Sequence, residues 1–254
     1  QKYGWEVIPP ATGRLACGAV GAGKLPEPEL ILEYILRAIA IPKDLLGKKV
    51  LVTAGPTREA LDPVRFITNH STGKMGYAIA KMAMLRGAEV TLITGATALT
   101  PPPFVKVVHI VSAKDMFAAV KEYAPQADMI FKAAAVADYT PASVSDQKMK
   151  KSDSDLSIPL NRTQDILAWL GANRRENQVI CGFSMETENM LENSQKKLAK
   201  KNCHMICANS LRTEGAGFGV DTNIITLITK DSVEELEKMS KDQAAHKILD
   251  KLLS

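Results

Sequence analysis

The segment at residues 67–76 carries the residue types and spacing that are best suited to chemistry. It reads I-T-N-H-S-T-G-K-M-G and follows a strand-like run. Its small residues Ser71, Thr72 and Gly73 let backbone N–H groups turn toward an anion. The apolar-periodic run at 75–85 predicts a helix whose positive dipole end faces that anion. The segment therefore predicts a pocket for a polyphosphate, and a plain strand–helix connection is the alternative.

The most familiar phosphate-binding motifs do not fit this segment. A Walker A loop requires G-x-x-x-x-G-K-[ST], but Thr68 stands at the place of its first glycine and Met75 follows Lys74. No G-x-G-x-x-G follows the first strand candidate either. A P-loop NTPase and the standard dinucleotide fingerprint are therefore disfavoured. A strand that leads through a small-residue loop into a helix still agrees with a doubly wound fold.

Strand and helix patterns alternate beyond Lys48 and predict an α/β fold. Apolar runs typical of strands cover residues 49–54, 89–94, 105–111, 128–134, 179–183, 204–208 and 224–229. Helical periodicity covers residues 75–86, 113–123, 164–172, 189–201 and 233–253, the last behind a capping-box pattern, Ser232-x-x-Glu235. We expect a Rossmann-like, doubly wound, mainly parallel sheet flanked by helices. Most loops after its strands then lie at one edge, where ligands of open α/β sheets bind.

Two regions break this alternation. Residues 138–155 are polar and lysine-rich and are too long for an ordinary connection. We interpret them as a mobile flap over the site, with a floppy surface loop as the alternative. Residues 1–44 contain a glycine-rich stretch at 13–23, an amphipathic run at 29–40 and a linker around Pro42.

The composition predicts a globular, cytoplasmic protein. Of the 254 residues, 24% are charged and 46% are hydrophobic, and no apolar run reaches the length of a membrane span. The net charge of +4 suits the handling of small anions, but the sequence lacks the basic stripe of a nucleic-acid surface. No signal peptide is expected, and the start at Gln1 favours a piece of a longer polypeptide.

The cysteines at 17, 181, 203 and 207 lack the pattern of secreted disulfides, so we expect free thiols in a reducing compartment. Cys203, His204 and Cys207 have the residue types of a metal site. They lie in an apolar strand-like run without a second ligand pair, which favours a buried structural role.

Four blocks stand out together: G-P-T-R-E-A-L-D-P-V-R-F-I-T-N-H-S-T-G-K-M-G at 55–76, A-A-V-A-D-Y at 134–139, K-M-K-K at 148–151 and I-C-A-N at 206–209. In combination they resemble bacterial phosphopantothenoylcysteine synthetase, the ligase half of a fused coenzyme A biosynthesis enzyme. The resemblance spans about residues 46–254. It implies a ligase domain at 45–254.

The preceding block, P-P-A-T-G-R-L-A-C-G-A-V-G-A-G-K-L-P-E-P, resembles the C-terminal end of the flavin-dependent phosphopantothenoylcysteine decarboxylase, the other half of the fusion. Residues 1–44 are then a decarboxylase remnant with a linker. The resemblance makes Cys17 of the A-C-G motif a proton donor in the full-length fusion only. The FMN-binding part is missing, so no decarboxylation is expected from this chain.

The resemblance implies a ligase that joins 4'-phosphopantothenate to L-cysteine. In this family CTP activates the carboxylate as an acyl-cytidylate, with Mg²⁺ as the expected cation, and the amine of cysteine then displaces CMP. The family also implies a homodimer that pairs through extended strands, for which residues 156–160 and 224–229 are the candidates. No nucleic-acid or membrane partner is expected.

The resemblance places Asn69 at the reacting centre, Arg65 near the carboxylate or phosphate of the substrate, and Lys148 of the flap on the nucleotide. The positions implied for nucleotide binding are Ser71, Thr72, Gly73, Lys132, Ala133, Ala134, Ala135, Asp138, Lys148, Asn161, Arg162, Thr163, Gln164, Phe183, Lys197 and Lys201. Asp138 is also the candidate contact for the cation, and the main chain at 133–135 is expected to read the cytosine.

Each assignment has a simpler alternative. Asn69 has the residue type of a turn or helix cap, and Arg65 that of a surface salt bridge. Lys197 and Lys201 share one face of a predicted helix, and such clusters are commonly solvated. Thr163-Gln164 replaces an Asn-Pro turn of the family, which favours backbone contacts in that loop. An NAD(P)-binding oxidoreductase and a non-catalytic nucleotide-binding module remain alternative functions.

Overall fold

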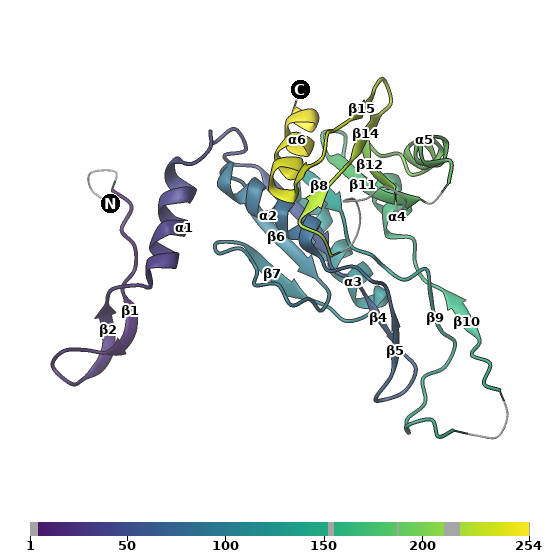
Figure 1. The fold of residues 1–254 in the computed structure, drawn as a ribbon, viewed down its shortest axis with the longest axis horizontal. Helices are drawn as coiled ribbons and strands as arrows, with labels where there is room; N and C mark the ends of the chain where they lie inside the picture. The colour runs from purple at the N-terminus through teal and green to yellow at the C-terminus, as the bar shows by residue number, and fades with distance from the viewer. Residues whose placement is uncertain (1–4, 152–154, 187, 211–218, 254) are drawn as a thin grey trace.

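The computed structural model describes residues 5–151, 155–186, 188–210 and 219–253. Its centre is an eight-stranded sheet in the order β15-β14-β12-β11-β8-β3-β6-β7 (Figure 1). The strands are β3 (Lys49–Ala54), β6 (Glu89–Thr94), β7 (Lys106–His109), β8 (Met129–Lys132), β11 (Val179–Glu186), β12 (Met205–Ser210), β14 (Thr226–Thr229) and β15 (Val233–Glu235). The strands from β12 to β7 are parallel, and β14 and β15 add an antiparallel edge. The predicted mainly parallel sheet is confirmed.

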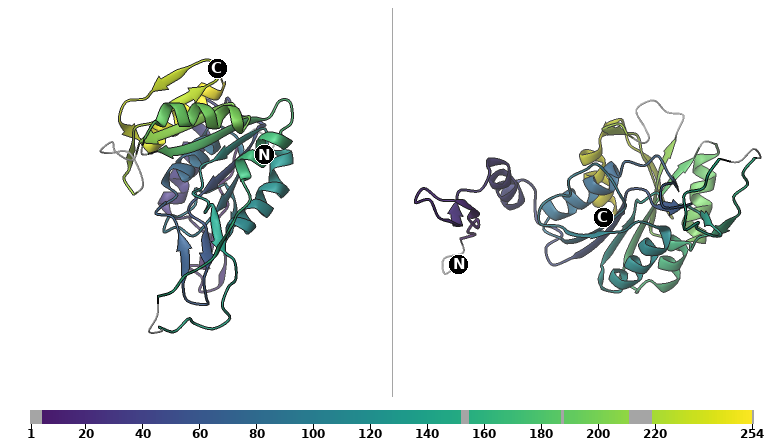
Figure 2. Two further views of the ribbon diagram at one scale, coloured as in Figure 1. Left: turned by 90° about the vertical axis from the view of Figure 1, so that its right-hand side faces the viewer. Right: turned by 90° about the horizontal axis from the view of Figure 1, so that it is seen from below.

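Helices cover both faces of the sheet (Figures 1 and 2). One face packs against α2 (Lys74–Leu85) and α6 (Lys241–Leu253), and the other against α3 (Ala113–Tyr123), α4 (Ile166–Asn173) and α5 (Met190–Lys200). Because side chains alternate along a strand, Val50 and Val52 of β3 belong to the first core and Leu51 to the second. None of the described helices is long and apolar enough to cross a lipid bilayer.

Local sequence sets several helix boundaries. Ser112 begins α3 through a capping box, in which its hydroxyl accepts a hydrogen bond from Asp115 N and the Asp115 carboxylate accepts one from Ser112 N. At the end of α2, Arg86 is only 3% exposed and its guanidinium bonds to the carboxylates of Asp44 and Asp250. Arg86 thereby ties the segment before β3 to both helices of the first face.

Two hairpins project from the sheet beside each other (Figure 1). One is formed by β4 (Arg58–Ala60) and β5 (Phe66–Thr68), the other by β9 (Tyr139–Pro141) and β10 (Leu160–Arg162). The β4–β5 hairpin lies between β3 and α2, where the sequence predicted a loop alone. Strands of only three residues are too short to show an alternation, which explains the omission.

Part of the predicted flap belongs to this second hairpin. Its residues 139–141 form β9, and Ser145 N donates a hydrogen bond to Leu61 O over 3.0 Å, so the flap lies against the loop between β4 and β5. Residues 152–154 of the flap lie outside the described residues.

The N-terminal segment extends away from the sheet (Figures 1 and 2). It contains the hairpin β1 (Ala11–Arg14) and β2 (Val20–Lys24), followed by α1 (Pro28–Ile39). The ring of Tyr34 in α1 lies 4.6 Å from that of Phe104, and the Arg37 guanidinium lies 4.7 Å over the same ring. Phe104, which follows the proline run, is held at a left-handed φ of 64°. Aromatic contact therefore links α1 to the body of the protein.

Two predictions for the C-terminal region were wrong. The helix predicted at 233–253 begins only at Lys241, because residues 233–235 form β15 and residues 239–240 form β16 (Met239–Ser240). Ser232 does not cap a helix. It lies in the turn between β14 and β15, where its N–H donates to Thr229 Oγ1 over 3.1 Å. The predicted helix does form from Lys241 onward, but residues 233–235 pair with β14 as a strand.

The same pairing corrects one candidate for the dimer contact. Residues 226–229 form β14, which pairs with β12 on one side and β15 on the other, so the proposed strand at 224–229 has no open edge. The candidate at 156–160 reaches only the first residue of β10, at Leu160. The short strand β13 (Thr222–Asn223) pairs with β16 and brings Asn223 close to the start of α6. The remaining short element is the 3-10 helix at Ala124–Gln126.

Candidate functional site

A cavity of about 390 Å³ opens at the carboxyl ends of the parallel strands, where ligands of open α/β sheets bind. Its lining comes from the loop before α2 and the first turn of that helix, from the ends of β8, β11 and β12, from the last residue of β13 and from the first residue of α6. The lining residues are Asn69, Ser71, Thr72, Gly73, Lys74, Met75, Gly76, Lys132, Ala133, Ala134, Ala135, Val136, Asp138, Phe183, Ser184, Met185, Lys197, Asn209, Asn223 and Lys241. We call this space the main cavity.

The predicted anion loop lies at the start of α2, as expected. Gly73 precedes the helix at a φ of 81°, a left-handed conformation that glycine adopts without strain. Its N–H donates to Ser71 Oγ over 3.3 Å, a long contact that an incoming anion can replace. A Cβ added to Gly76 would lie 2.6 Å from the Ala54 Cβ, so glycine is required for α2 to pack this closely on β3. The positive end of α2 therefore faces the main cavity.

A smaller space of about 110 Å³ continues from the main cavity and shares Lys132, Asp138 and Phe183 with it. We call it the side cavity. The structure brings the predicted pair Lys197 and Lys201 together here, with Thr163 and Gln164.

Both lysines of this pair already make contacts within the protein. Lys201 forms an ion pair with Asp165, the N-cap residue of α4, and Lys197 donates to Phe183 O over 2.9 Å. Burial acts to raise the pKa of Asp165, but hydrogen bonds from Lys201 and from Ala168 N outweigh it and lower that pKa. The side cavity therefore combines fixed positive and negative charges.

Lys132 lies at the junction of the two cavities, at the end of β8. Its ammonium donates to Ala134 O over 3.0 Å. Desolvation, followed by the positive charge of Lys197, lowers the pKa of Lys132 to about 8, although Asp138 and Asp165 act in the opposite direction. An anion bound between the cavities would relieve the unfavourable desolvation of this cation.

The chain at 133–135 is held by hydrogen bonds on both sides. Ala134 N donates to Thr53 Oγ1 over 3.2 Å, and Ala135 N donates to Gly55 O over 3.0 Å. Asn69 Nδ2 donates to Ala135 O over 3.0 Å, so Asn69 is positioned at the rim of the cavity. These N–H groups are occupied, and Ala135 O already accepts hydrogen bonds from Asn69 Nδ2 and from Thr57 N. Ala134 O accepts one from Lys132 and can accept a second. A base that rests here would meet that acceptor.

Arg65, Lys148, Asn161 and Arg162 lie on the projecting hairpins and do not line either cavity within this chain. Lys148 is exposed on the flap. Cys17 is exposed in the turn between β1 and β2, also away from the cavities. The predicted roles of these residues stay predictions.

Asp62, which sequence reasoning did not single out, fastens the flap to the β4–β5 hairpin. Its side chain accepts hydrogen bonds from the N–H groups of Val64, Arg65 and Met149, at 2.8, 2.8 and 3.0 Å. Although desolvation opposes them, these bonds lower the pKa of Asp62 to about 2. The guanidinium of Arg65 bonds to Asp62 and to Met149 O. Arg65 therefore helps to hold the flap at Met149 against the β4–β5 hairpin.

The main cavity also contains buried polar side chains that the sequence analysis missed, among them Asn209, Asn223 and Lys241. Asn209 ends the quoted I-C-A-N block, and an amide that closes an apolar strand was the available signal. Asn223 and Lys241 gave none, because the one was expected beside a strand and the other in the middle of a helix.

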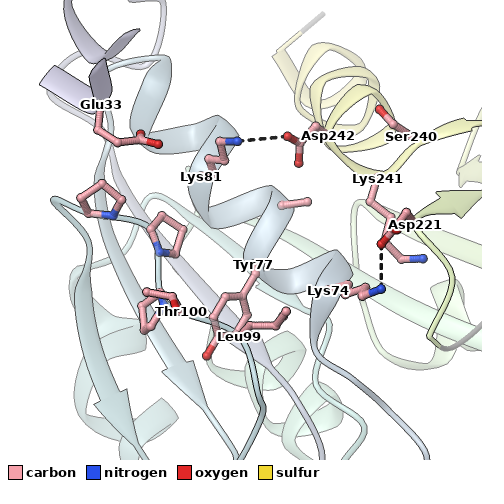
Figure 3. A pocket seen from close by; sticks show the side chains of 14 residues that line it. Glu33, Lys74, Tyr77, Lys81, Leu99, Thr100, Asp221, Ser240, Lys241 and Asp242 are labelled. Carbon is pink, nitrogen blue, oxygen red and sulfur yellow. Dashed lines mark hydrogen bonds and ion pairs between the residues drawn. The ribbon is translucent and has the colours of Figure 1, made fainter. Parts of the chain in front are cut away.

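A separate space of about 570 Å³ lies on the outer side of α2, between that helix, the proline run and the start of α6 (Figure 3). It is bordered by the ion pairs Lys74–Asp221, at 2.7 Å, and Lys81–Asp242, at 3.2 Å. Lys74 and Lys241 also line the main cavity. The outer space therefore adjoins the candidate site but contains none of the residues predicted for it.

No three His, Cys, Asp or Glu side chains among the described residues form a group able to hold a metal ion by themselves. Cys207 and Cys181 are buried, with their Sγ atoms 3.6 Å apart, and His204 Nδ1 accepts a hydrogen bond from Ile180 N. Of the three residues for which a buried structural role was predicted, Cys207 is buried, whereas Cys203 and His204 are half-buried. Among the residues that the structure describes, Asp138 is the one carboxylate lining the main cavity.

Comparison with known proteins gives a family match over residues 45–254, to the model described as DNA/pantothenate metabolism flavoprotein C-terminal domain. The coenzyme A biosynthesis bifunctional protein CoaBC of Bacillus subtilis (strain 168) is 47% identical over 253 residues, which cover 98% of this chain and 62% of that protein. This chain thus spans less than two thirds of the length of that relative.

Two further similarities cover most of the chain. A protein named cysteine/cysteine sulfinic acid decarboxylase, from an unknown prokaryotic organism, is 41% identical over 260 residues, covering all of this chain and 72% of that protein. The crystal structure of the C-terminal domain of a coenzyme A biosynthesis bifunctional protein CoaBC superposes with a TM-score of 0.71 at 46% identity. It covers 82% of this chain and 95% of that domain.

Proposed function

This chain belongs to the DNA/pantothenate metabolism flavoprotein C-terminal domain family, and we propose that it is the CTP-dependent ligase that joins 4'-phosphopantothenate to L-cysteine in coenzyme A biosynthesis. The observation that carries this proposal is the main cavity, in which an anion-binding helix start, Asn69 and Lys132 meet at the carboxyl edge of the sheet. The similarity to CoaBC proteins supports the same reaction.

The first half-reaction activates a carboxylate. One of its oxygens attacks the α-phosphorus of the nucleotide, the bond to the bridging oxygen breaks, and pyrophosphate leaves with the electron pair. Backbone N–H groups at Ser71 to Gly73 and the ammonium of Lys132 are suited to hold the negative charges together while this bond changes. Their contribution is positioning and electrostatic stabilisation, because neither group forms a covalent bond.

The second half-reaction transfers the acyl group. The amine of cysteine attacks the acyl carbon, a C–N bond forms, the C–O bond to the phosphate breaks, and CMP leaves, while the nitrogen releases its proton to solvent. Asn69 at the cavity rim is the residue we assign to this step. Its amide is already oriented by the hydrogen bond to Ala135 O, so it needs little reorganisation.

Cytosine is proposed to lie against residues 133–135. Its exocyclic amino group is a donor, and the carbonyl oxygen of Ala134, which accepts one hydrogen bond from Lys132, retains acceptor capacity. Lys197 and Lys201 in the side cavity are then close to the nucleotide rather than solvated.

Mg²⁺ fits this donor set as an ion that the nucleotide carries. Such sites use one or two carboxylates together with phosphate oxygens, and the main cavity offers one carboxylate, Asp138. The ion would neutralise charge on the phosphates and on the leaving pyrophosphate.

A turnover assay tests this function. Pyrophosphate release is measured with CTP, ATP, GTP or UTP in turn, with and without phosphopantothenate and cysteine. We expect release with CTP only when phosphopantothenate is present, and amide product only when cysteine is added. Pyrophosphate release that needs no phosphopantothenate, or none with any nucleotide, would overturn the proposal. The absorbance of a reduced nicotinamide cofactor, followed in the presence of the protein, tests the oxidoreductase alternative. An unchanged absorbance would exclude it.

A further inference from the structure

The anion loop, residues 71–73, is supported from behind by the side chain of Thr97. A Cβ added to Gly73 would lie 2.8 Å from Thr97 Cγ2, and a Cβ added to Gly55 would lie 2.9 Å from the same methyl carbon. The two glycines also lie against each other, because the Cβ added to Gly73 would be 3.3 Å from Gly55 Cα. The methyl group of Thr97 therefore fills the space behind the turn that follows β3 and the turn that precedes α2.

Both turns have backbone conformations that depend on their neighbours. Gly55 has a φ of 71° and Gly73 a φ of 81°, and glycine loses more conformational freedom on folding than any other residue. The N–H of Gly73 donates to Ser71 Oγ over 3.3 Å, which is a long hydrogen bond, so contacts within the loop hold it weakly. Packing against Thr97 therefore limits the directions in which the N–H groups of the anion loop can point.

Hydrogen bonds fix the orientation of the Thr97 side chain. Leu99 N donates to Thr97 Oγ1 over 3.3 Å, and the Thr97 hydroxyl donates to Tyr77 Oη over 3.1 Å. Tyr77 Oη lies 3.3 Å from Thr94 Oγ1, whose hydroxyl donates to Gly95 O over 2.9 Å, so each hydroxyl in this chain can donate once and accept once. Because threonine is stiff about χ1, fixing its oxygen also fixes its methyl group. The chain of hydroxyls thereby directs the methyl group toward the two glycines.

The loop that carries Thr97 is itself packed tightly on the turn after β3. Gly95 N donates to Ala54 O over 3.1 Å, and a Cβ added to Gly95 would lie 1.9 Å from Pro56 O, so the two main chains are in contact. Thr97 lies outside the lining of the main cavity. It can therefore influence a bound anion only through the backbone of the glycines that it supports.

We infer that Thr97 is a positioning residue for the polyphosphate of the nucleotide, and that its methyl group holds the anion loop in the conformation that binds phosphate. This inference rests on the proposed ligase function and adds to it a residue that does not touch the substrate. A loop that is held in its binding conformation before the nucleotide arrives loses less conformational entropy when the nucleotide binds. Removal of the methyl group should therefore weaken the binding of phosphates and leave the binding of the amino acid unchanged.

Two substitutions separate the methyl group from the hydroxyl. Thr97→Ser keeps the hydrogen bonds and removes the methyl group, and it should raise the KM for CTP by about threefold to tenfold, the equivalent of one buried methyl group. Thr97→Val keeps the methyl group and removes the hydroxyl, so the KM for CTP should stay within about twofold even though Tm falls with the loss of the hydrogen bonds. The KM for L-cysteine should stay within about twofold in both variants. Thr100→Ser and Thr100→Val, at an exposed threonine of the same loop, are the matched controls and should change none of these quantities.

Calorimetric titration with tripolyphosphate gives a readout that needs no turnover. Its Kd should rise by about threefold to tenfold in the Thr97→Ser protein and stay within about twofold in the Thr97→Val protein. A merely structural threonine would make the affinity follow Tm, so that the valine variant is weakened as much as the serine variant. That result overturns the inference, as does an unchanged Kd in the Thr97→Ser protein or the absence of tripolyphosphate binding to the unsubstituted protein. If the unsubstituted protein binds tripolyphosphate but releases no pyrophosphate from CTP and phosphopantothenate, the ligase proposal fails and the role of Thr97 in phosphate binding is still decided by the titration.

Discussion

Replacement of Lys132 by methionine should stabilise the protein while it weakens nucleotide binding. Methionine keeps the length of the side chain and removes its charge. Desolvation and Lys197 lower the pKa of Lys132 from 10.5 to about 8, and at about 1.4 kcal/mol for each pKa unit this corresponds to about 3 kcal/mol of unfavourable free energy when the group is charged. Loss of its hydrogen bond to Ala134 O costs about 1 kcal/mol. At pH 7 the net gain in the free energy of unfolding is therefore about 2 kcal/mol.

The sign of the pH dependence follows from the same values. The pKa of Lys132 is lower in the folded than in the unfolded protein, so the unfolded chain binds more protons between about pH 8 and 10.5. The unsubstituted protein should therefore gain stability as the pH rises through this window, and lose that gain as the pH falls from about 10.5 to about 8. The methionine variant lacks this contribution, so its advantage at pH 7 should disappear near pH 10.

Urea denaturation of both proteins at pH 7, 8.5 and 10 measures this difference, and other ionisations cancel because they occur in both. Lys150→Met, at an exposed lysine of the flap, is the matched control and should change stability little at any of these pH values. The Lys132→Met protein should bind nucleotide more weakly than the unsubstituted protein, whereas the Lys150→Met protein should bind it equally well. A Lys132→Met protein that is less stable at pH 7, or whose difference from the unsubstituted protein does not vary with pH, would refute the reasoning.

Three further substitutions test the scaffold and the reacting centre. Arg86→Met should lower the free energy of unfolding by about 3 kcal/mol in urea denaturation, because it leaves two partly buried carboxylates without their cation; a loss below about 1 kcal/mol would contradict this. Gly171→Ala places a Cβ 1.8 Å from Lys201 O and should cost about 2 kcal/mol or more, with weaker nucleotide binding, whereas unchanged melting and binding would show that the contact relaxes freely. Asn69→Asp should still form pyrophosphate but slow amide formation, and a product rate equal to that of the unsubstituted protein would remove Asn69 from the transfer step.

The fold could be predicted wherever the apolar residues followed one clear periodicity, that of a helix or that of a strand. The helix at 113–123 was placed at its observed bounds, because Ser112 and Asp115 cap it and its apolar face is regular. The hairpin β4–β5 and the strands β15 and β16 were not found, because segments of two or three residues are too short to show a period of two. The apolar stripe of α6 was extended into β15 for the same reason.

The anion-binding part of the site could be predicted because its residues are consecutive in the sequence. Ser71, Thr72 and Gly73 directly precede the helix whose positive end they expose, so one short motif contains both the loop and the dipole. The resemblance to a known family added the more distant Lys132, Lys197 and Lys201, which the structure brings to adjoining cavities. Arg65 and Lys148 were expected at the same centre, but the fold places them on hairpins that project from it.

Asn209, Asn223 and Lys241 could not be found in this way, because they come from segments that only strand pairing brings together. Asn209 is the last residue but one of β12, Asn223 ends β13, and Lys241 begins α6 after the pairing of β13 with β16. Each is unremarkable in sequence, and only its burial in the main cavity makes it informative. The donors for an anion therefore come from one contiguous motif, whereas this part of the cavity wall depends on the packing of the C-terminal segment.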